Sequence, residues 1–258
     1  VLLFVAVGLP ILILFLFGEP YKRGFFCDDE SIKYPYKDST VSNTVLYIVG
    51  LGVTVLIVRL FQMLLVELMH WWRGDENGHT FKLCGKHIPL WLSNSYKVIG
   101  VFGFGAVCSQ LLTDIGKYSI GRLRPHFMDI CSPNISCDMP ENQHKYIETF
   151  TCNGGDEKLL RDARLSFPSG HSSFSAYTML YLVIYLQCRL NWKGSYLLRH
   201  VVQFCCLAMV WGTALSRVSN YKHHWSDVTA GLIIGIVVAI VNVSFIYLQT
   251  FLSINCPF

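Results

Sequence analysis

The sequence predicts an all-α polytopic membrane protein, with six transmembrane helices in a single bundle. Two observations carry this prediction. The 258 residues are 52% hydrophobic with a mean hydropathy of +0.41, and only 15% are charged, against about 25% in soluble domains. The chain also contains six apolar runs close to the roughly 20 residues that a helix needs to cross a bilayer. These runs cover residues 1–18, 43–68, 94–115, 170–188, 199–216 and 227–251.

The first, second, third and fifth runs need separate arguments. Residues 1–18 hold no charge; a signal peptide is the alternative, but no basic segment precedes the run and no small-residue cleavage site follows it. The second run contains Arg59. The third and fifth runs reach full length through flanks with Lys97 and Arg199, whose aliphatic stems can lie in the hydrocarbon while the charges reach the interface. A count of four or five spans therefore stays open.

The fourth run, and the sixth run after Asp227, contain no charged residue. The sixth run also carries Gly231-x-x-x-Gly235, a spacing of small residues that lets another helix approach closely. Packing within this bundle is its expected meaning. The chain has no internal repeat, low-complexity tract or soluble domain, so we predict a single membrane domain over residues 1–258.

Composition argues against nucleic-acid and metal partners. The net charge is only +4, and no basic helix carries interleaved aromatic residues of the kind that a nucleic-acid groove needs. The ten cysteines show no paired C-x-x-C spacing, and no carboxylate cluster suggests bound Mg²⁺ or Zn²⁺. We therefore expect no metal and no cofactor, with membrane lipids as partners; a homo-oligomer stays open. Four cysteines fall in the two longer loops, and their pairing also stays open: Cys27, Cys131, Cys137 and Cys152.

Three islands of polar residues, 117–125, 168–171 and 216–227, lie against the apolar runs. Successive spans alternate in direction, so the ends of spans three and five and the starts of spans four and six lie on one membrane face. The islands occupy these four places. Helix parity therefore predicts one composite site at the membrane surface.

The first island offers two cations. Lys117 and Arg124 are seven residues apart and share a face if the helix continues, although Gly121 and Pro125 disfavour helix near Arg124. An ammonium and a guanidinium fork at a helix end can clamp a dianionic phosphate. The alternative is that both side chains merely reach the membrane interface.

The second island is Pro168-Ser169-Gly170-His171, directly before the fourth run. Pro and Ser suit a helix start, and Gly lets the backbone approach a ligand. Free N–H groups at a helix start bind anions, and His171 is placed to donate a proton there. A plain helix cap with an interfacial histidine is the alternative.

The third island contains Arg217, His223 and Asp227. If this stretch is helical, His223 and Asp227 lie one turn apart on one face. The carboxylate then fixes the tautomer of His223 and leaves its other nitrogen free to attack phosphorus. His224 is a rival nucleophile, but Val228 stands four residues after it. A surface ion pair is the alternative to a catalytic pair.

Together the islands supply three cations, backbone N–H groups, a nucleophilic histidine and a proton donor. Phosphoryl transfer asks mainly for positioning and charge stabilisation. This set therefore suffices for phosphate chemistry without a metal ion.

The islands resemble the signatures of the type-2 phosphatidic acid phosphatase superfamily, in its animal lipid phosphate phosphatase branch. Flanking residues such as Tyr221-Lys222-His223-His224-Trp225-Ser226-Asp227 are also similar to that branch. The signature positions are Lys117-x6-Arg124-Pro125, Pro168-Ser169-Gly170-His171 and Ser216-Arg217-x5-His223-x3-Asp227.

This resemblance implies an integral membrane enzyme that hydrolyses lipid phosphate monoesters such as phosphatidate, lysophosphatidate, ceramide 1-phosphate and sphingosine 1-phosphate. It implies that His223 forms a phosphohistidine, that Asp227 orients His223, and that His171 protonates the leaving alkoxide and later activates water. The residues that it implies for phosphate binding are Lys117, Arg124, Ser169, Gly170 and Arg217.

Three other classes share features with this chain. Vanadium haloperoxidases carry the same signature but are soluble, which six apolar runs argue against. Glucose 6-phosphatase is a membrane relative with a sugar substrate, and the flanking residues fit the lipid branch better. A non-enzymatic scaffold is the third class, and intact His171, Arg217 and His223 argue against it.

Two signals disagree on which side of the membrane the site faces. The sequon Asn134-Ile135-Ser136 and several cysteines lie in the loop 116–167, which fits an oxidising exterior or lumen and a glycan at Asn134. Lys and Arg, however, are more numerous on this face than in segments 69–89 and 189–199, opposite to the positive-inside rule. Long loops translocate regardless of charge, so we expect a plasma-membrane protein with an outward site, or a site facing the lumen of an internal membrane.

Overall fold

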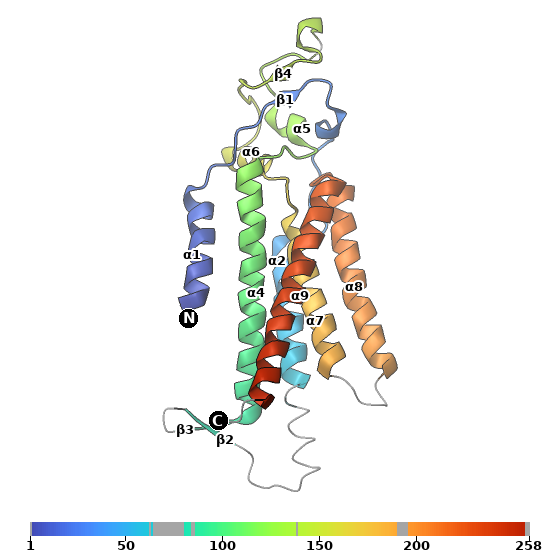
Figure 1. The fold of residues 1–258 in the computed structure, drawn as a ribbon. Coiled ribbons are helices and arrows are strands. Elements are labelled where there is room, and N and C mark those ends of the chain that lie inside the picture. The colour runs from blue at the N-terminus through green and yellow to red at the C-terminus, as the bar shows by residue number, and fades with distance from the viewer. Residues whose placement is uncertain are drawn as a thin grey trace.

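The computed structural model describes residues 2–61, 63, 80–83, 86–137, 139–189 and 196–255. Figure 1 shows long helices side by side, with a cap of short elements at one end. The helices follow the six predicted runs. They are α1 (Leu2–Phe17), a helix over Asn43–Phe61 that includes α2 (Asn43–Tyr47) and the π-helical η2 (Ile48–Val53), α4 (Leu90–Ile120), α7 (Gly170–Arg189), α8 (Tyr196–Ser219) and α9 (Trp225–Asn255).

Four of these helices are long and apolar enough to cross a membrane, so the predicted count of six spans is not confirmed. The four are Asn43–Phe61, Ser95–Ile120, Leu197–Ser219 and Trp225–Ser244. The apolar helix Leu3–Phe17 is shorter. The 20-residue helix α7 does not qualify, although its ends match the predicted run at 170–188 closely.

Helix α7 is polar because its neighbours are protein. It packs against α4, α8, α9 and the helix formed by α2 and η2. Its buried tyrosines are hydrogen-bonded to carbonyls of α4: the Tyr177 hydroxyl donates to Phe102 (2.7 Å) and the Tyr181 hydroxyl to Val98 (3.1 Å). A buried hydroxyl that finds a partner avoids the cost of desolvation. The central position of α7 therefore permits the serines and tyrosines that lower its hydropathy.

Helices α7 and α9 form the most extensive helix–helix contact in the described part of the chain. A Cβ at Gly231 would collide with the carbonyl oxygen of Ser169, and a Cβ at Gly235 with that of Ser173. Only glycine at both positions lets the two backbones lie this near. The Gly231-x-x-x-Gly235 pattern thus serves packing within the bundle, as predicted.

At the opposite end of the bundle from the cap, β2 (Thr80–Leu83) and β3 (Lys86–Pro89) form an antiparallel hairpin just before α4.

The cap comprises segments before α2 and between α4 and α7. In it, β1 (Phe25–Phe26) pairs antiparallel with β4 (Tyr146–Ile147). Its other elements are η1 (Glu30–Ile32), α5 (Phe127–Cys131), η3 (Pro140–Asn142) and α6 (Glu157–Asp162).

The cap has its own small apolar core and two disulfides. Phe25, Phe127 and Ile147 are buried in this core. The disulfides Cys27–Cys137 and Cys131–Cys152 join all four loop cysteines, which decides the pairing that the sequence left open. Two-residue strands and one-turn helices carry no periodic signal, so the sequence predicted no ordered cap.

We expect both disulfides to stabilise the protein, and Cys27–Cys137 more than Cys131–Cys152. The first closes a separation of 110 residues and the second one of 21. In the chain-entropy model such loops correspond to about 4–5 and about 3 kcal/mol. Replacing both cysteines of a pair with serine should lower the thermal denaturation temperature of the purified protein. The decrease should be larger for the Cys27–Cys137 pair than for the Cys131–Cys152 pair. Cys188→Ser removes an exposed free thiol and should have no effect; equal temperatures for all three variants would contradict the prediction.

Candidate active site

Four helix ends meet beneath the cap, as helix parity predicted. The Ser169 amide, just before α7, donates to the Asp227 carbonyl in the first turn of α9 (3.0 Å). Arg122, just after α4, donates through Nη1 to Asp227 Oδ1 (2.6 Å). His223, just after α8, has its Nδ1 2.7 Å from the Ser166 carbonyl oxygen. The three polar islands therefore form one site.

The C-terminus of α8 turns the chain back onto itself. The Tyr221 amide donates to the Val218 carbonyl (3.0 Å) and the Lys222 amide to the Arg217 carbonyl (3.1 Å). This pair of bonds is a Schellman motif, with Tyr221 in the left-handed position at φ 53°. The His223 amide also donates to the Arg217 carbonyl (3.2 Å). The turn thus places His223 beside the last turn of α8.

His223 is buried, with 3% of its surface exposed. A carbonyl oxygen only accepts, so Nδ1 carries the proton and Nε2 keeps a free lone pair. Burial lowers the pKa of His223 well below its usual value, and the positive charges of Arg124 and Arg217 add to this effect. The ring is therefore neutral near pH 7, which is the state that a nucleophile requires.

Asp227 does not bind His223 directly, contrary to the sequence-based expectation. Its Oδ2 accepts hydrogen bonds from the Ser166 hydroxyl (2.6 Å) and the His224 amide (3.0 Å). The same oxygen lies 3.2 Å from His224 Nδ1. The predicted i+4 contact assumed a continuous helix, but α9 begins only at Trp225. Asp227 therefore caps the start of α9. Among the described residues, it is linked to His223 through Ser166.

The charges of three predicted cations act on His223. Lys117 Nζ lies 3.5 Å from Asp114 Oδ1, and Arg124 Nη2 lies 2.7 Å from Asp162 Oδ1. Arg217 donates through Nη1 to the Ser39 hydroxyl (3.2 Å). Arg124 and Arg217 are both buried, and the Nε of each has no acceptor in the described part of the chain. These two donors can serve oxygens of an anion.

The start of α7 supplies backbone donors, with one exception. The Ser169 amide is already bonded to the Asp227 carbonyl, so it is not a free donor. Among the described residues, no acceptor is found for the amides of Gly170, His171 and Ser172. A Cβ at Gly170 would lie 3.1 Å from Lys117 Nζ, which places the ammonium at this helix start. The helix N-terminus and Lys117 together favour an anion.

His171 is the second residue of α7. Its Nε2 lies 3.1 Å from the carbonyl oxygen of Val41, which precedes α2. The charges of Arg217, Lys117 and Arg124 act on His171 as they act on His223. The two histidines therefore share one cationic environment.

Sequence reasoning missed Lys222. Its side chain is buried and its Nζ lies 3.6 Å over the ring of Tyr36. Burial lowers the pKa of Lys222 to about 8, helped by repulsion from Arg124 and Arg217. Its position beside His223 in the sequence was the only signal, since Tyr36 lies in another segment.

His126 was missed as well. It is buried, and its Nδ1 lies 2.7 Å from the Tyr221 carbonyl oxygen. Desolvation lowers the pKa of His126 to about 4 despite that bond. The neutral His126 therefore holds Tyr221, the left-handed residue of the turn before His223, through this hydrogen bond.

The sequence of this chain is similar to those of phospholipid phosphatases. Phospholipid phosphatase 1 of Rattus norvegicus is 45% identical over 242 residues, which are 93% of this chain and 80% of that protein. Phospholipid phosphatase 2 of Homo sapiens is 41% identical over 250 residues, which are 95% of this chain and 81% of that protein.

One solved structure is similar to this chain with a lower sequence identity. It is the crystal structure of the first transmembrane PAP2 type phosphatidylglycerolphosphate phosphatase from Bacillus subtilis, with a TM-score of 0.38 and 18% identity over 80% of this chain and 78% of that one. At that TM-score the likeness adds nothing to the assignment. A model of the PAP2 superfamily matches residues 99–251, which include all three polar islands. The chain therefore belongs to the PAP2 superfamily, among its members named phospholipid phosphatases.

Proposed function

We propose that this phosphatase hydrolyses phosphate monoesters of lipids through a phosphohistidine on His223, without a metal ion. The substrates that we propose are phosphatidate, lysophosphatidate, ceramide 1-phosphate and sphingosine 1-phosphate. The observation that carries the proposal is a neutral, buried His223 with a free Nε2 among three cations. The names of the relatives support a phospholipid as substrate.

In the first step, Nε2 of His223 attacks phosphorus as the bond to the lipid oxygen breaks. His171 gives a proton to that oxygen, which leaves as the lipid alcohol. Nε2–H of His171 is bonded to the Val41 carbonyl, so the proton that His171 gives is Nδ1–H of its imidazolium form, which the negative charge of the bound phosphate stabilises. In the second step, His171 removes a proton from water, the water oxygen attacks phosphorus, and the N–P bond breaks to release phosphate.

The phosphoryl oxygens have enough donors nearby. We propose that Lys117, Arg124 and Arg217 hold them, together with Ser169 through its hydroxyl and Gly170 through its backbone amide at the start of α7. Asp227 acts through Ser166, whose carbonyl fixes the tautomer of His223. Fixed donors that face a developing charge lower the barrier to phosphoryl transfer.

We further propose six membrane spans, with α1 and α7 as the two beyond the four apolar helices, and a site that faces outside or into a lumen. Helix α7 lies alongside the apolar helices over its length. The cap carries two disulfides and an exposed sequon at Asn134. Disulfides and N-glycans belong to oxidising compartments, which supports a plasma-membrane enzyme with the cap outside.

We expect His223→Ala to lower hydrolysis of labelled phosphatidate in detergent micelles by at least about 10³-fold, because it removes the attacking nitrogen. The assay contains EDTA and no added metal. Acid-labile phosphate on the wild-type protein should be absent from the variant. The exposed His200 at the other end of α8 gives a control, His200→Ala, with full activity. Full activity of His223→Ala, or a loss in EDTA that Mg²⁺ restores, would contradict the mechanism.

We expect the efficiency kcat/KM to fall as the pH rises through about 8, because Lys222 then loses its proton and its charge. Lys222→Arg keeps its charge to above pH 12 and should move this fall to higher pH. Lys222→Met should lower kcat/KM about tenfold below pH 8, the equivalent of about 1.4 kcal/mol. A fall at the same pH in Lys222→Arg would contradict the assignment. The other charged groups that act on Lys222 are Arg124, Arg217, Asp162 and Asp38.

We expect a glycan at Asn134 when the protein is made in animal cells. The Asn134 side chain is exposed, and its Oδ1 accepts from the Thr151 amide (3.1 Å), which leaves the amide nitrogen accessible. A glycosidase should increase gel mobility, and Asn134→Gln should have the same effect. A second sequon, Asn242-Val243-Ser244, lies in α9 with its asparagine buried, so Asn242→Gln should leave the glycan unchanged. Labelling of the cap only after cell permeabilisation would contradict the outward orientation.

A further inference from the structure

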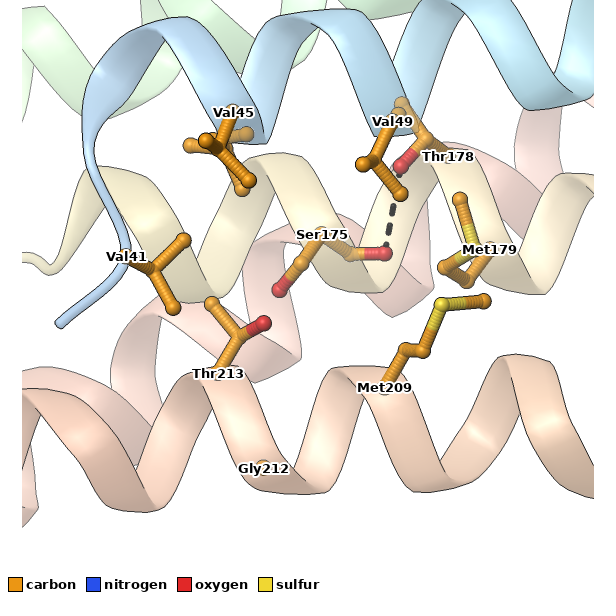
Figure 2. Close-up of a pocket in the computed structure, with 11 residues that line it drawn as sticks. Val41, Val45, Val49, Ser175, Thr178, Met179, Met209, Gly212 and Thr213 are labelled. Atoms are coloured by element: carbon orange, nitrogen blue, oxygen red, sulfur yellow. Dashed lines mark hydrogen bonds between the residues drawn. The ribbon is translucent and has the colours of Figure 1, made fainter.

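An apolar pocket of ≈ 280 Å³ lies among α2, η2, α7 and α8. Figure 2 shows Val45 and Val49 from one side facing Met209 and Thr213 from the other, with α7 behind them. The hydroxyls that α7 contributes are bonded within their own helix: Ser175 donates to the Ser172 carbonyl (3.3 Å), and Thr178 to the Phe174 carbonyl (3.0 Å). The wall that α7 presents is therefore effectively apolar.

The pocket opens sideways. Both the α2–η2 helix and α8 pack against α7, but in the described part of the chain they make no extensive contact with each other. Two residues at the pocket are partly exposed, Val45 at 50% and Met209 at 39%. Because these helices are apolar enough to span a membrane, we expect the exposed side to meet hydrocarbon.

One end of the pocket reaches the candidate active site. Val41 lines the pocket with its side chain, and its carbonyl oxygen is bonded to His171 Nε2. Ser175, another lining residue, lies one helical turn after His171. In the proposed reaction, His171 faces the oxygen that leaves with the lipid. Whatever is attached to that oxygen thus begins next to the pocket.

We propose that this pocket holds the first part of one hydrocarbon chain of the substrate, while the remainder stays in the bilayer. The inference rests on the proposed lipid phosphatase function and names the chain-binding part of that site. A water molecule occupies about 30 Å³, so the pocket has room for about nine groups of methylene size. From His171 to Met179, where the pocket ends on α7, the helix rises about 12 Å.

Two local features suit this role. The π-helix η2 lines the pocket with Val49 and Gly50, and π-helical turns inside α-helices are frequent at functional sites. Met179 and Met209 line the deep end, and methionine side chains adapt to irregular apolar partners. The pocket can therefore accept chains of differing shape.

Gly212 offers a direct test because it lines the pocket and a Cβ there would have no atom within 4 Å. Gly212→Leu adds an apolar side chain in open space and replaces a poor helix former with a good one. The experiment measures kcat/KM for oleoyl lysophosphatidate and for glycerol 3-phosphate, which has the same headgroup and no chain. Each buried methylene corresponds to a factor of about four in binding. We expect the ratio of the two efficiencies to fall at least tenfold in Gly212→Leu.

Gly52→Leu is the matched control, because Gly52 is exposed, has equally open space and does not line the pocket. It should keep the wild-type ratio. Met209→Ala widens the pocket and should raise the efficiency for a methyl-branched chain relative to a straight one. This second variant tests the pocket even if Gly212→Leu were to fold poorly.

Three results would overturn the inference. One is an unchanged ratio in Gly212→Leu together with an unchanged chain preference in Met209→Ala. Another is an equal loss on both substrates in Gly212→Leu, because a chain pocket does not act on a substrate without a chain. The third is a wild-type protein that hydrolyses no lipid phosphate, which would overturn the proposed function first and the chain pocket with it.

Discussion

Gly231 and Gly235 let helix α9 lie so close to α7 that backbone carbonyls of α7 occupy the space where side chains would start. The rest of the site depends on this contact. It sets the height of the first turn of α9 against the start of α7, so that the Asp227 carbonyl meets the Ser169 amide. A larger residue at either glycine would force the helices apart, because a close-packed interior has no space to absorb the added atoms. The Ser166–Asp227 bond would be stretched with them.

Beneath the cap, positive charge is concentrated in a small volume. Lys117, Arg124 and Arg217 act on the same histidine, and Lys222 is repelled by two of them. Carboxylates offset part of this repulsion, with Asp162 on Arg124 and Asp114 on Lys117. Asp162 is half exposed, so its ion pair with Arg124 is partly screened by solvent. The remaining positive field favours a ligand with two negative charges, which is what a phosphate monoester carries at neutral pH.

Much of the architecture could be predicted from hydropathy and helix parity alone. The starts of α7 and α9 lie within two residues of the predicted runs at 170 and 227, and the three islands meet as parity required. The number of spans was harder, because α7 is polar by sequence and central by position. Hydropathy measures affinity for lipid, whereas α7 faces protein on most sides. The cap also escaped prediction, since its order comes from disulfides and a small core between distant segments rather than from any local pattern.

Sequence patterns also could not predict how the site residues are arranged. A continuous helix through 216–227 would bring His223 and Asp227 together, as the sequence suggested. It would also turn about 600° over the six residues from Arg217 to His223, which leaves those two side chains about 120° apart around the helix axis.

The chain instead ends α8 in a Schellman turn with Tyr221 in the left-handed conformation. That conformation costs on the order of 1–3 kcal/mol in a non-glycine residue. The turn brings His223 beside Arg217, and the task of orienting His223 passes to the Ser166 carbonyl. No pattern of residue types distinguishes a continuous helix from this turn, because Tyr221 is not a residue that marks a left-handed helix end. Tyr221 is held there by one hydrogen bond from His126 and by stacking of Tyr34, and both residues belong to the cap. The cap is therefore part of the active site's construction, since it holds the strained turn on which the attacking nitrogen is placed.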